Sequence, residues 1–307
     1  MSIRHNDSEL RKSQITHIFE LSGGIGNQLF QIEAAKMLCS KPVFDKSMLR
    51  PPFMKHSSLV EDVVGLERFE SLDRLNEMGV FRWNIENKFQ TLGNVIFRNR
   101  PFFRHLRIEE SGWNLETADL IRISQVPLII RGYFQSHKFL SFTPQGPGCT
   151  PFAMTSVAER EADRLKLDES PWAWLHVRRG DFNRVRDTAG LLGAEYYKRG
   201  IEYLSKNFGI ARFALFSDDA ESAANLFTNI RDVEIMHSSN QLDVASTLAL
   251  MSRAQGAVIG NSTFSYWGAA KNPNAAAIIS PSPWFKAGII PKDLIPPHWV
   301  SIDADFV

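Results

Sequence analysis

The chain has 307 residues, 44% hydrophobic and 22% charged, a balance typical of a folded globular protein rather than a disordered one. Lys and Arg total 35 against 34 for Asp and Glu, so a formal net charge of +1 provides no global attraction to nucleic acid. Residues 1–14 lack the apolar segment of a signal peptide, and no run approaches the roughly 18 apolar residues of a membrane span. Two cysteines, Cys39 and Cys149, are too few for a disulfide framework or a zinc site, so we expect a cytoplasmic protein.

The first half of the chain predicts one α/β unit. We expect a flexible tail over residues 1–15, a strand over 17–21, a Gly-rich turn over 22–26 and a helix over 27–40. A β-turn-α opening of this kind usually begins a parallel sheet. The apolar run 126–131 is typical of a strand that is buried on both faces.

The second half repeats this pattern after a Pro/Gly-rich linker, residues 143–151 (TPQGPGCTP). The strands expected there are 172–177, 212–216, 257–260 and 275–280. One helix is expected to end near residue 167, and two more are expected over 194–206 and 244–251. We therefore expect two Rossmann-like α/β lobes, residues 16–150 and 151–307, with a cleft between them. Ligands of such sheets bind at the carboxyl ends of the strands.

Two arginines leave the predicted strand 172–177 in the segment 176–181 (HVRRGD). A guanidinium offers a planar fork of donors that matches phosphate oxygens and keeps its charge near neutral pH. Arg178 and Arg179 therefore form a candidate pyrophosphate clamp. The alternative is a surface Arg–Asp pair that stabilises a loop by about 0–1 kcal/mol.

The segment 260–268 (GNSTFSYWG) follows an apolar strand and is expected to open a helix. Hydroxyls and unpaired backbone N–H groups at the positive end of a helix bind anions, which makes this turn a second candidate phosphate site. The simpler interpretation is that Asn261 or Ser262 only caps the helix while Phe264, Tyr266 and Trp267 pack in the core.

Two further segments lie at strand ends. The acidic pair in residues 216–219 (FSDD) could accept hydrogen bonds from ribose or a guanine edge, or could merely favour a helix N-terminus. We disfavour a metal, since no partner ligand stands at convincing spacing. The turn 23–31 (GGIGNQLFQ) lacks the glycine spacing of dinucleotide and P-loop motifs, but its glycines, Gly24 among them, permit close backbone approach, and Asn27 and Gln28 offer amides.

Taken together, these segments resemble the α-1,2-fucosyltransferases of glycosyltransferase family 11. That family's pattern is GG[LI]GNQLFQ, GYFQ, HVRRGDY, FSDD and NSTFSWWGAWL, in this order. The corresponding segments here are residues 23–31, 132–135, 176–182, 216–219 and 261–270, so the resemblance covers nearly the whole chain after residue 17. Departures are the run 253–256 (RAQG), Tyr266 in place of a common Trp, and Ala270-Lys271 in place of Trp-Leu.

The resemblance implies a GT-B-like fold, GDP-β-L-fucose as the donor, inversion to an α-linked product, and no cofactor or metal. By similarity Arg178 would hold the pyrophosphate, with Arg179 structural or secondary. The residues expected to line the donor pocket are Asn261, Ser262, Thr263 and Phe264, joined by Asp218 or Asp243 at the ribose or guanine and by Gly24, Asn27 and Gln28 across the cleft.

An inverting reaction is helped by a base near the acceptor hydroxyl. The candidates are Asp181 and Asp187, in the loop after the arginines, and His176, which is less favoured because a strand histidine is usually packed. A weak base suffices when the transition state is highly dissociative.

The resemblance also suggests the 2-hydroxyl of a galactoside as the acceptor, in a lipid-linked O-antigen repeat or another oligosaccharide. The stretch 81–107 interleaves arginines with aromatic residues and could touch the inner membrane surface, although a wet helical face is the simpler interpretation. The alternatives are another GDP-sugar transferase, a non-catalytic nucleotide- or glycan-binding module and, last, a dehydrogenase.

Overall fold

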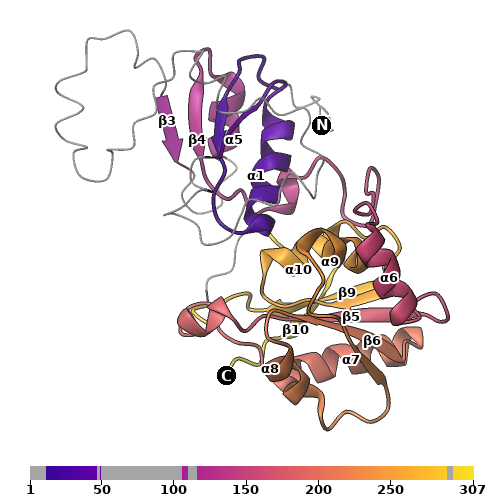
Figure 1. Cartoon of the computed structure of the whole chain (residues 1–307). Helices are drawn as coiled ribbons and strands as arrows, with labels where there is room; N and C mark the ends of the chain where they lie inside the picture. Colours follow the sequence, from indigo (N-terminus) through magenta and orange to yellow (C-terminus); the bar gives the residue numbers. More distant parts are fainter. Residues whose placement is uncertain (1–11, 47–48, 50–105, 110–115, 289–292) are drawn as a thin grey trace, which may run out of the picture.

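The computed structural model describes residues 12–46, 49, 106–109, 116–288 and 293–307. These residues form two α/β lobes, each built on a parallel sheet (Figure 1). Of the stretch 81–107, which we considered for membrane contact, residues 81–105 lie outside the described residues. Within the described ranges, no helix is long and apolar enough to cross a membrane.

The N-terminal lobe is a four-stranded sheet in the order β2-β1-β4-β3. Its elements are β1 (Ile18–Glu20), α1 (Ile25–Leu38), β2 (Val43–Asp45), β3 (Leu106–Glu109), α5 (Glu116–Ile123), β4 (Leu128–Arg131) and the 3-10 helix η2 (His137–Phe139). Helix α1 is buried on two sides: Ile32 and Leu38 join the core of this lobe, whereas Phe30 joins the core of the other lobe. Ten of its fourteen residues are buried, the polar residues Gln28, Gln31 and Glu33 among them, as expected of a helix that lies between two layers.

The C-terminal lobe is a six-stranded parallel sheet in the order β10-β9-β8-β5-β6-β7. Its strands are β5 (Trp172–Val177), β6 (Arg212–Ser217), β7 (Glu234–His237), β8 (Gly256–Val258), β9 (Ala277–Ser282) and β10 (Val300–Asp303). Its helices are α6 (Ser156–Arg164), η3 (Asp181–Arg184), α7 (Ala194–Phe208), α8 (Ala220–Ala224), η4 (Asn225–Phe227), α9 (Val244–Met251) and α10 (Thr263–Ala270).

Counted from β5, this sheet has the 3-2-1-4-5-6 strand order of the doubly wound nucleotide-binding fold. The order reverses between β5 and β8, which pair directly. Strand β5 is buried at all six positions, as its continuous apolar run predicts for a central parallel strand. The β5/β8 border is therefore the switch point at which this fold binds ligands.

The chain passes from one core to the other earlier than its composition suggests. Phe139 packs in the N-terminal core and Leu140 in the C-terminal core, so the C-terminal packing begins before the linker 143–151 and before the predicted boundary after residue 150. The predicted tail over residues 1–15 is also too long. Ser13 is 3% exposed and forms a parallel bridge with Cys39.

The predicted two-lobed α/β fold of GT-B type is confirmed, and most predicted elements lie within two or three residues of their observed bounds. Strands β2, β3, β7 and β10 and helices α5 and α8 were missed. The lobes meet where α10 lies below the amino end of α1 (Figure 1). The carboxyl ends of both sheets open at this junction.

Candidate active site

A cleft of about 720 Å³ lies between the lobes, a size typical of small-molecule sites. Its walls are loops that follow the carboxyl ends of strands in both sheets. The residues that line it are Gly23, Gly24, Ile25, Gly26, Asn27, Gln28, Gln135, His176, Arg178, Phe182, Phe216, Ser217, Asp218, Ser238, Ser239, Asn240, Leu242, Val244, Thr247, Asn261, Ser262, Thr263, Phe264, Trp284 and Phe285. The structure thus brings together residues from all five motif segments and from the first residues after β7.

Arg178 enters the cleft directly after β5, beside the switch point. Its NH1 lies 3.2 Å from Oδ2 of Asp218, which follows the neighbouring strand β6. Oδ1 of the same carboxylate accepts a hydrogen bond from the backbone N–H of Arg179 at 2.8 Å. A Cβ on Gly180 would come within 2.5 Å of Asp218 Oδ2, so the glycine lets the carboxylate close on the turn. Asp218 therefore fixes both the turn and the guanidinium.

The amino end of α10 forms the opposite side of the switch point. Ser262 is the N-cap, and its hydroxyl accepts a hydrogen bond from the backbone N–H of Phe264 at 3.3 Å. The Nδ2 of Asn261 donates to the carbonyl groups of Ala189 and Gly190, at 2.9 and 3.2 Å, and ties the turn to the loop after η3. Ser262, Thr263 and Phe264 all line the cleft, so the amino end of α10, where a helix stabilises negative charge, borders it.

The N-terminal lobe contributes a wall of side-chain amides from the first turn of α1. Gln135 donates from Nε2 to Asn27 Oδ1 at 2.8 Å, which joins the loop after β4 to α1. Gln28 donates from Nε2 to the carbonyl oxygen of Gly23 at 2.8 Å, and its buried Oε1 accepts no hydrogen bond from the described protein atoms. Gly24, the N-cap of α1, has no atom within 4 Å of its Cβ position, so the cleft is open beside it.

His176 lies on β5 beneath the cleft and is 3% exposed. Burial, with a smaller contribution from the charge of Arg178, lowers the pKa of the imidazole to about 3. Its ring lies beside Phe264, with 5.4 Å between the ring centroids. The histidine is therefore neutral near pH 7 and a weak proton acceptor, which opposes the role of base that we considered for it.

Other predicted site residues point elsewhere. The guanidinium of Arg179 is buried outside the cleft lining and donates from NH2 to the carbonyl oxygen of Leu192 at 2.7 Å. Asp243 is the N-cap of α9, its Oδ1 accepts from the N–H of Ser246 at 2.7 Å, and it is not among the residues that line the cleft, so its contact with ribose or guanine stays a prediction. Asp187 lies exposed in the loop after η3, away from the cleft lining. Asp181 begins η3, and its side chain lies outside the described part of the structure.

Part of the cleft was not predicted from the sequence. The residues concerned are Gln135, Phe182, Phe216, Ser217, Ser238, Ser239, Asn240, Leu242, Val244, Thr247, Trp284 and Phe285. Ser238 to Asn240 come directly after β7, so recognising that strand would have placed them at the correct edge of the sheet. Trp284 and Phe285 follow β9 in the same way, although β9 itself was predicted.

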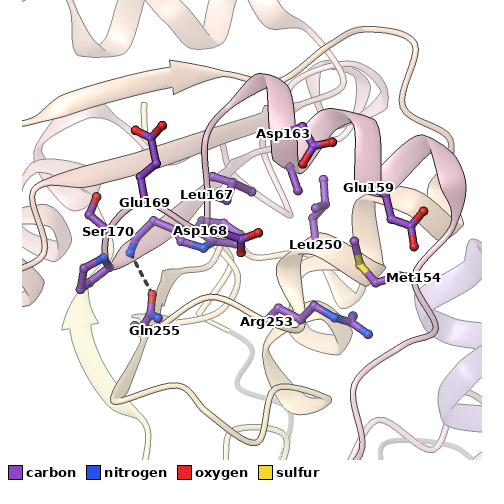
Figure 2. Close-up of a pocket in the computed structure, with 13 residues that line it drawn as sticks. Met154, Glu159, Asp163, Leu167, Asp168, Glu169, Ser170, Leu250, Arg253 and Gln255 are labelled. Carbon is purple, nitrogen blue, oxygen red and sulfur yellow. Dashed lines mark hydrogen bonds between the residues drawn. The ribbon is translucent and has the colours of Figure 1, made fainter.

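A second cavity, of about 630 Å³, lies at the amino end of β5, at the opposite end of this strand from the inter-lobe cleft (Figure 2). Its lining includes the carboxylates of Glu159, Asp163, Asp168 and Glu169 and the guanidinium of Arg253. This charge disfavours a diphosphate, so the inter-lobe cleft is the better candidate for an anionic ligand. Among the described residues, no group of three or more His, Cys, Asp or Glu side chains is arranged to hold a metal ion.

Comparison with known proteins agrees with this geometry. Residues 155–303 match the model of Glycosyl transferase family 11. The chain is 28% identical over 307 aligned residues to an alpha-1,2-colitosyltransferase of Escherichia coli, covering 93% of this chain and 98% of that protein.

Two other relatives match over shorter stretches. The O-antigen biosynthesis glycosyltransferase WbnK of E. coli is 33% identical, over 42% of this chain and 43% of its own. The galactoside 2-alpha-L-fucosyltransferase SEC1 of Bos taurus is 28% identical, over 44% of this chain and 39% of its own. Among solved structures, a family 9 glycosyl transferase from Veillonella parvula aligns with a TM-score of 0.47 at 9% identity, covering 96% of this chain and 87% of its own.

The predicted resemblance is therefore confirmed at the level of the family. The ordered segments, the family match over residues 155–303 and the nearly full-length likeness to a named transferase together show a glycosyltransferase that resembles family 11.

Proposed function

We propose that the chain transfers L-fucose from GDP-β-L-fucose to the 2-hydroxyl of a galactoside, with inversion and without a metal ion. The observation that carries the proposal is the convergence of Arg178 and the amino end of α10 at the switch point of a Rossmann-type sheet. A fixed cation and a helix N-terminus are the groups that proteins use to hold a diphosphate.

The C-terminal wall has room for the nucleoside next to this clamp. The residues after β7, with Val244 and Thr247 of α9, line the cleft on the side of β6 away from β8. They offer hydroxyls and an amide for a ribose and a base edge. The diphosphate then lies over the β5/β8 border, and the sugar points to the N-terminal amides Asn27, Gln28 and Gln135.

During transfer the bond between the anomeric carbon and the phosphate oxygen breaks, and its electron pair leaves with GDP. Arg178 and the N–H groups of α10 stabilise the negative charge that develops on that oxygen. The acceptor oxygen forms the new bond from the opposite face, which inverts the configuration, and its proton passes to a base or to water. Neutral His176, with its pKa lowered to about 3, supplies little of that basicity.

A second donor has support of its own. The relative that covers nearly the whole chain is named a colitosyltransferase, and its likeness spans both lobes. Colitose is the 3-deoxy counterpart of fucose, so GDP-colitose presents the same diphosphate and lacks one hydroxyl. Transfer of colitose is therefore the runner-up activity.

The test is a transfer assay with GDP-fucose, GDP-colitose, GDP-mannose and UDP-galactose on a panel of β-galactosides, with and without EDTA, followed by linkage analysis of the product. We expect α-1,2-linked fucose, and an equal rate with EDTA. Preferred use of GDP-colitose would replace the fucosyl assignment by the runner-up. Activity that disappears with EDTA would refute the metal-free clamp, and no turnover of any donor would leave a binding module.

A further inference from the structure

The ring of Tyr133 stands exposed beside the cleft. Its side chain belongs to the loop after β4, and the residue is 42% exposed, whereas the next two residues, Phe134 and Gln135, are 1% and 6% exposed. A Cβ built on Gly23 would lie 3.2 Å from Cε1 of Tyr133. Since Gly23 lines the cleft, the ring stands at its rim, on the N-terminal lobe.

The backbone around this ring is held by several contacts. Gln31 donates from Nε2 to the carbonyl oxygen of Gly132 at 2.8 Å. Phe134 has a φ of 52°, a left-handed conformation that costs an aromatic residue about 1–2 kcal/mol, and its ring packs edge-on against Phe139 at 5.4 Å. This conformation buries Phe134 while Gln135 reaches Asn27. Strain retained under such constraint is a common feature of functional sites.

An amide stands next to the ring. The Cβ position on Gly23 lies 2.7 Å from Asn27 Nδ2, so the ring edge and the amide nitrogen flank the same glycine. Gly23 has a φ of 73°, which suits glycine, and a larger residue there would meet both groups. An apolar aromatic surface beside a hydrogen-bond donor suits a pyranose ring, which carries an apolar C–H face and hydroxyls at its edge.

The position of the Tyr133 ring favours contact with the acceptor sugar rather than with the donor. The diphosphate clamp belongs to the C-terminal lobe, and inversion requires the acceptor to approach the anomeric carbon from the side away from the diphosphate. Tyr133 lies beside Gly23 on the N-terminal lobe, whereas the clamp lies on the C-terminal lobe, and it is not among the residues that line the cleft. We propose that Tyr133 is the platform of the acceptor subsite, on which the acceptor sugar stacks within reach of Asn27. This inference rests on the proposed glycosyl transfer.

Kinetics of Tyr133 variants with GDP-fucose and the preferred β-galactoside test it. We expect Tyr133→Ala to raise KM for the acceptor about tenfold, the effect of losing one aromatic stacking contact. KM for GDP-fucose and its slow hydrolysis without acceptor should stay unchanged. Tyr133→Phe and Tyr133→Trp keep a ring and should keep the acceptor KM of the wild type. The matched control is Phe208→Ala, an equally exposed aromatic residue (42%) at the end of α7.

The outcomes separate the two proposals. An unchanged acceptor KM in Tyr133→Ala overturns the platform, and so does a loss in Tyr133→Phe as large as that in Tyr133→Ala. A rise in the KM for GDP-fucose of Tyr133→Ala, with the acceptor KM unchanged, would place the ring at the donor and also overturn it. Failure of the wild type to transfer any sugar would instead refute the proposed function itself.

Discussion

Arg178 and Asp218 act as one unit in the cleft. The carboxylate binds the guanidinium through one oxygen and the backbone of the arginine turn through the other. A guanidinium fixed in this way pays little orientational entropy when a phosphate arrives, because its direction is set in advance. The same pair explains why an acidic residue lies close to a proposed anion site. Asp218 orients the guanidinium of Arg178, and the N-terminus of α10 remains available to the proposed diphosphate.

Replacing Arg178 tests this unit. We expect Arg178→Ala to reduce kcat by roughly 10²–10³, equivalent to about 3–4 kcal/mol, because one fixed donor to the leaving group is lost. The melting temperature should change little, because a partly exposed ion pair contributes little stability and Asp218 keeps its hydrogen bond to the backbone N–H of Arg179. The control is Arg160→Ala, an exposed arginine on α6, assayed in parallel by initial rates and thermal unfolding. Near-normal kcat in Arg178→Ala would refute the clamp.

His176 predicts a pH dependence of stability. Its pKa is about 3 in the folded chain and near 6.5 when unfolded, so the unfolded state takes up the proton first as the pH falls. Its contribution is fully present above pH 6.5 and is lost progressively between pH 6.5 and pH 3. We expect the wild type to lose about 2 kcal/mol of unfolding free energy from this group between pH 7 and pH 5.

The measurement is urea unfolding of the wild type and of His176→Phe at both pH values. The variant should show an acid loss that is smaller by about this amount. An identical acid loss in the two proteins would show that the imidazole is not buried in its neutral form.

At the scale of elements, α1 and α10 contact each other at their amino ends, beside the cleft. Trp267 of α10 donates from Nε1 to the carbonyl oxygen of Gly26 at 2.8 Å. A Cβ on Gly26 would lie 2.6 Å from the carbonyl oxygen of Thr263 and closer still to its carbonyl carbon. The contact therefore requires glycine at position 26. It also brings the amino ends of two helices, one from each lobe, to the same point of the cleft.

A substitution at this contact should separate the helices. We expect Gly26→Ala to lower the free energy of unfolding by about 1–3 kcal/mol, as for other overpacked positions, and to reduce activity by shifting the amide wall. Gly24→Ala is the matched control for stability, since its Cβ would meet nothing within 4 Å. Denaturant unfolding of both variants measures the difference. Equal stability of the two would mean that the helices can part without loss.

At the scale of the whole molecule, the cleft that we propose as the donor site has one wall from each lobe. A ligand that binds only this folded arrangement stabilises it by mass action. GDP at a hundredfold excess over its Kd should therefore raise the free energy of unfolding by about 2.7 kcal/mol, measured by thermal or urea unfolding. Guanosine at the same concentration should stabilise much less, because it lacks the diphosphate. Equal stabilisation by both would place the binding energy in the nucleoside rather than in the clamp.

The sequence predicted a strand well where a continuous run of apolar residues matches a strand that is buried in the fold. Strand β5 is buried at all six positions and apolar at all of them except His176, because both faces of the strand are covered, and it was predicted with its observed bounds. The edge strands β7 and β10 are four residues long, carry charged residues and have a single buried residue, Met236, so they lack the apolar run that marks β5. Missing β7 removed Ser238 to Asn240 from the predicted site. Asp243 and Asp218 illustrate a different limit, because a carboxylate at a strand or helix end serves as a cap or as a partner for arginine depending on distant contacts.

The glycine contact between α1 and α10 also governs how the two lobes can move. Any rotation of one lobe relative to the other that preserves the contact between Gly26 and Thr263 must have its axis pass through this contact. Groups near it, such as the amide of Asn27 and the N–H groups of Ser262 and Thr263, would then keep their spacing. The rims farthest away would travel most, so substrate could enter and product could leave while the reacting atoms stay in register.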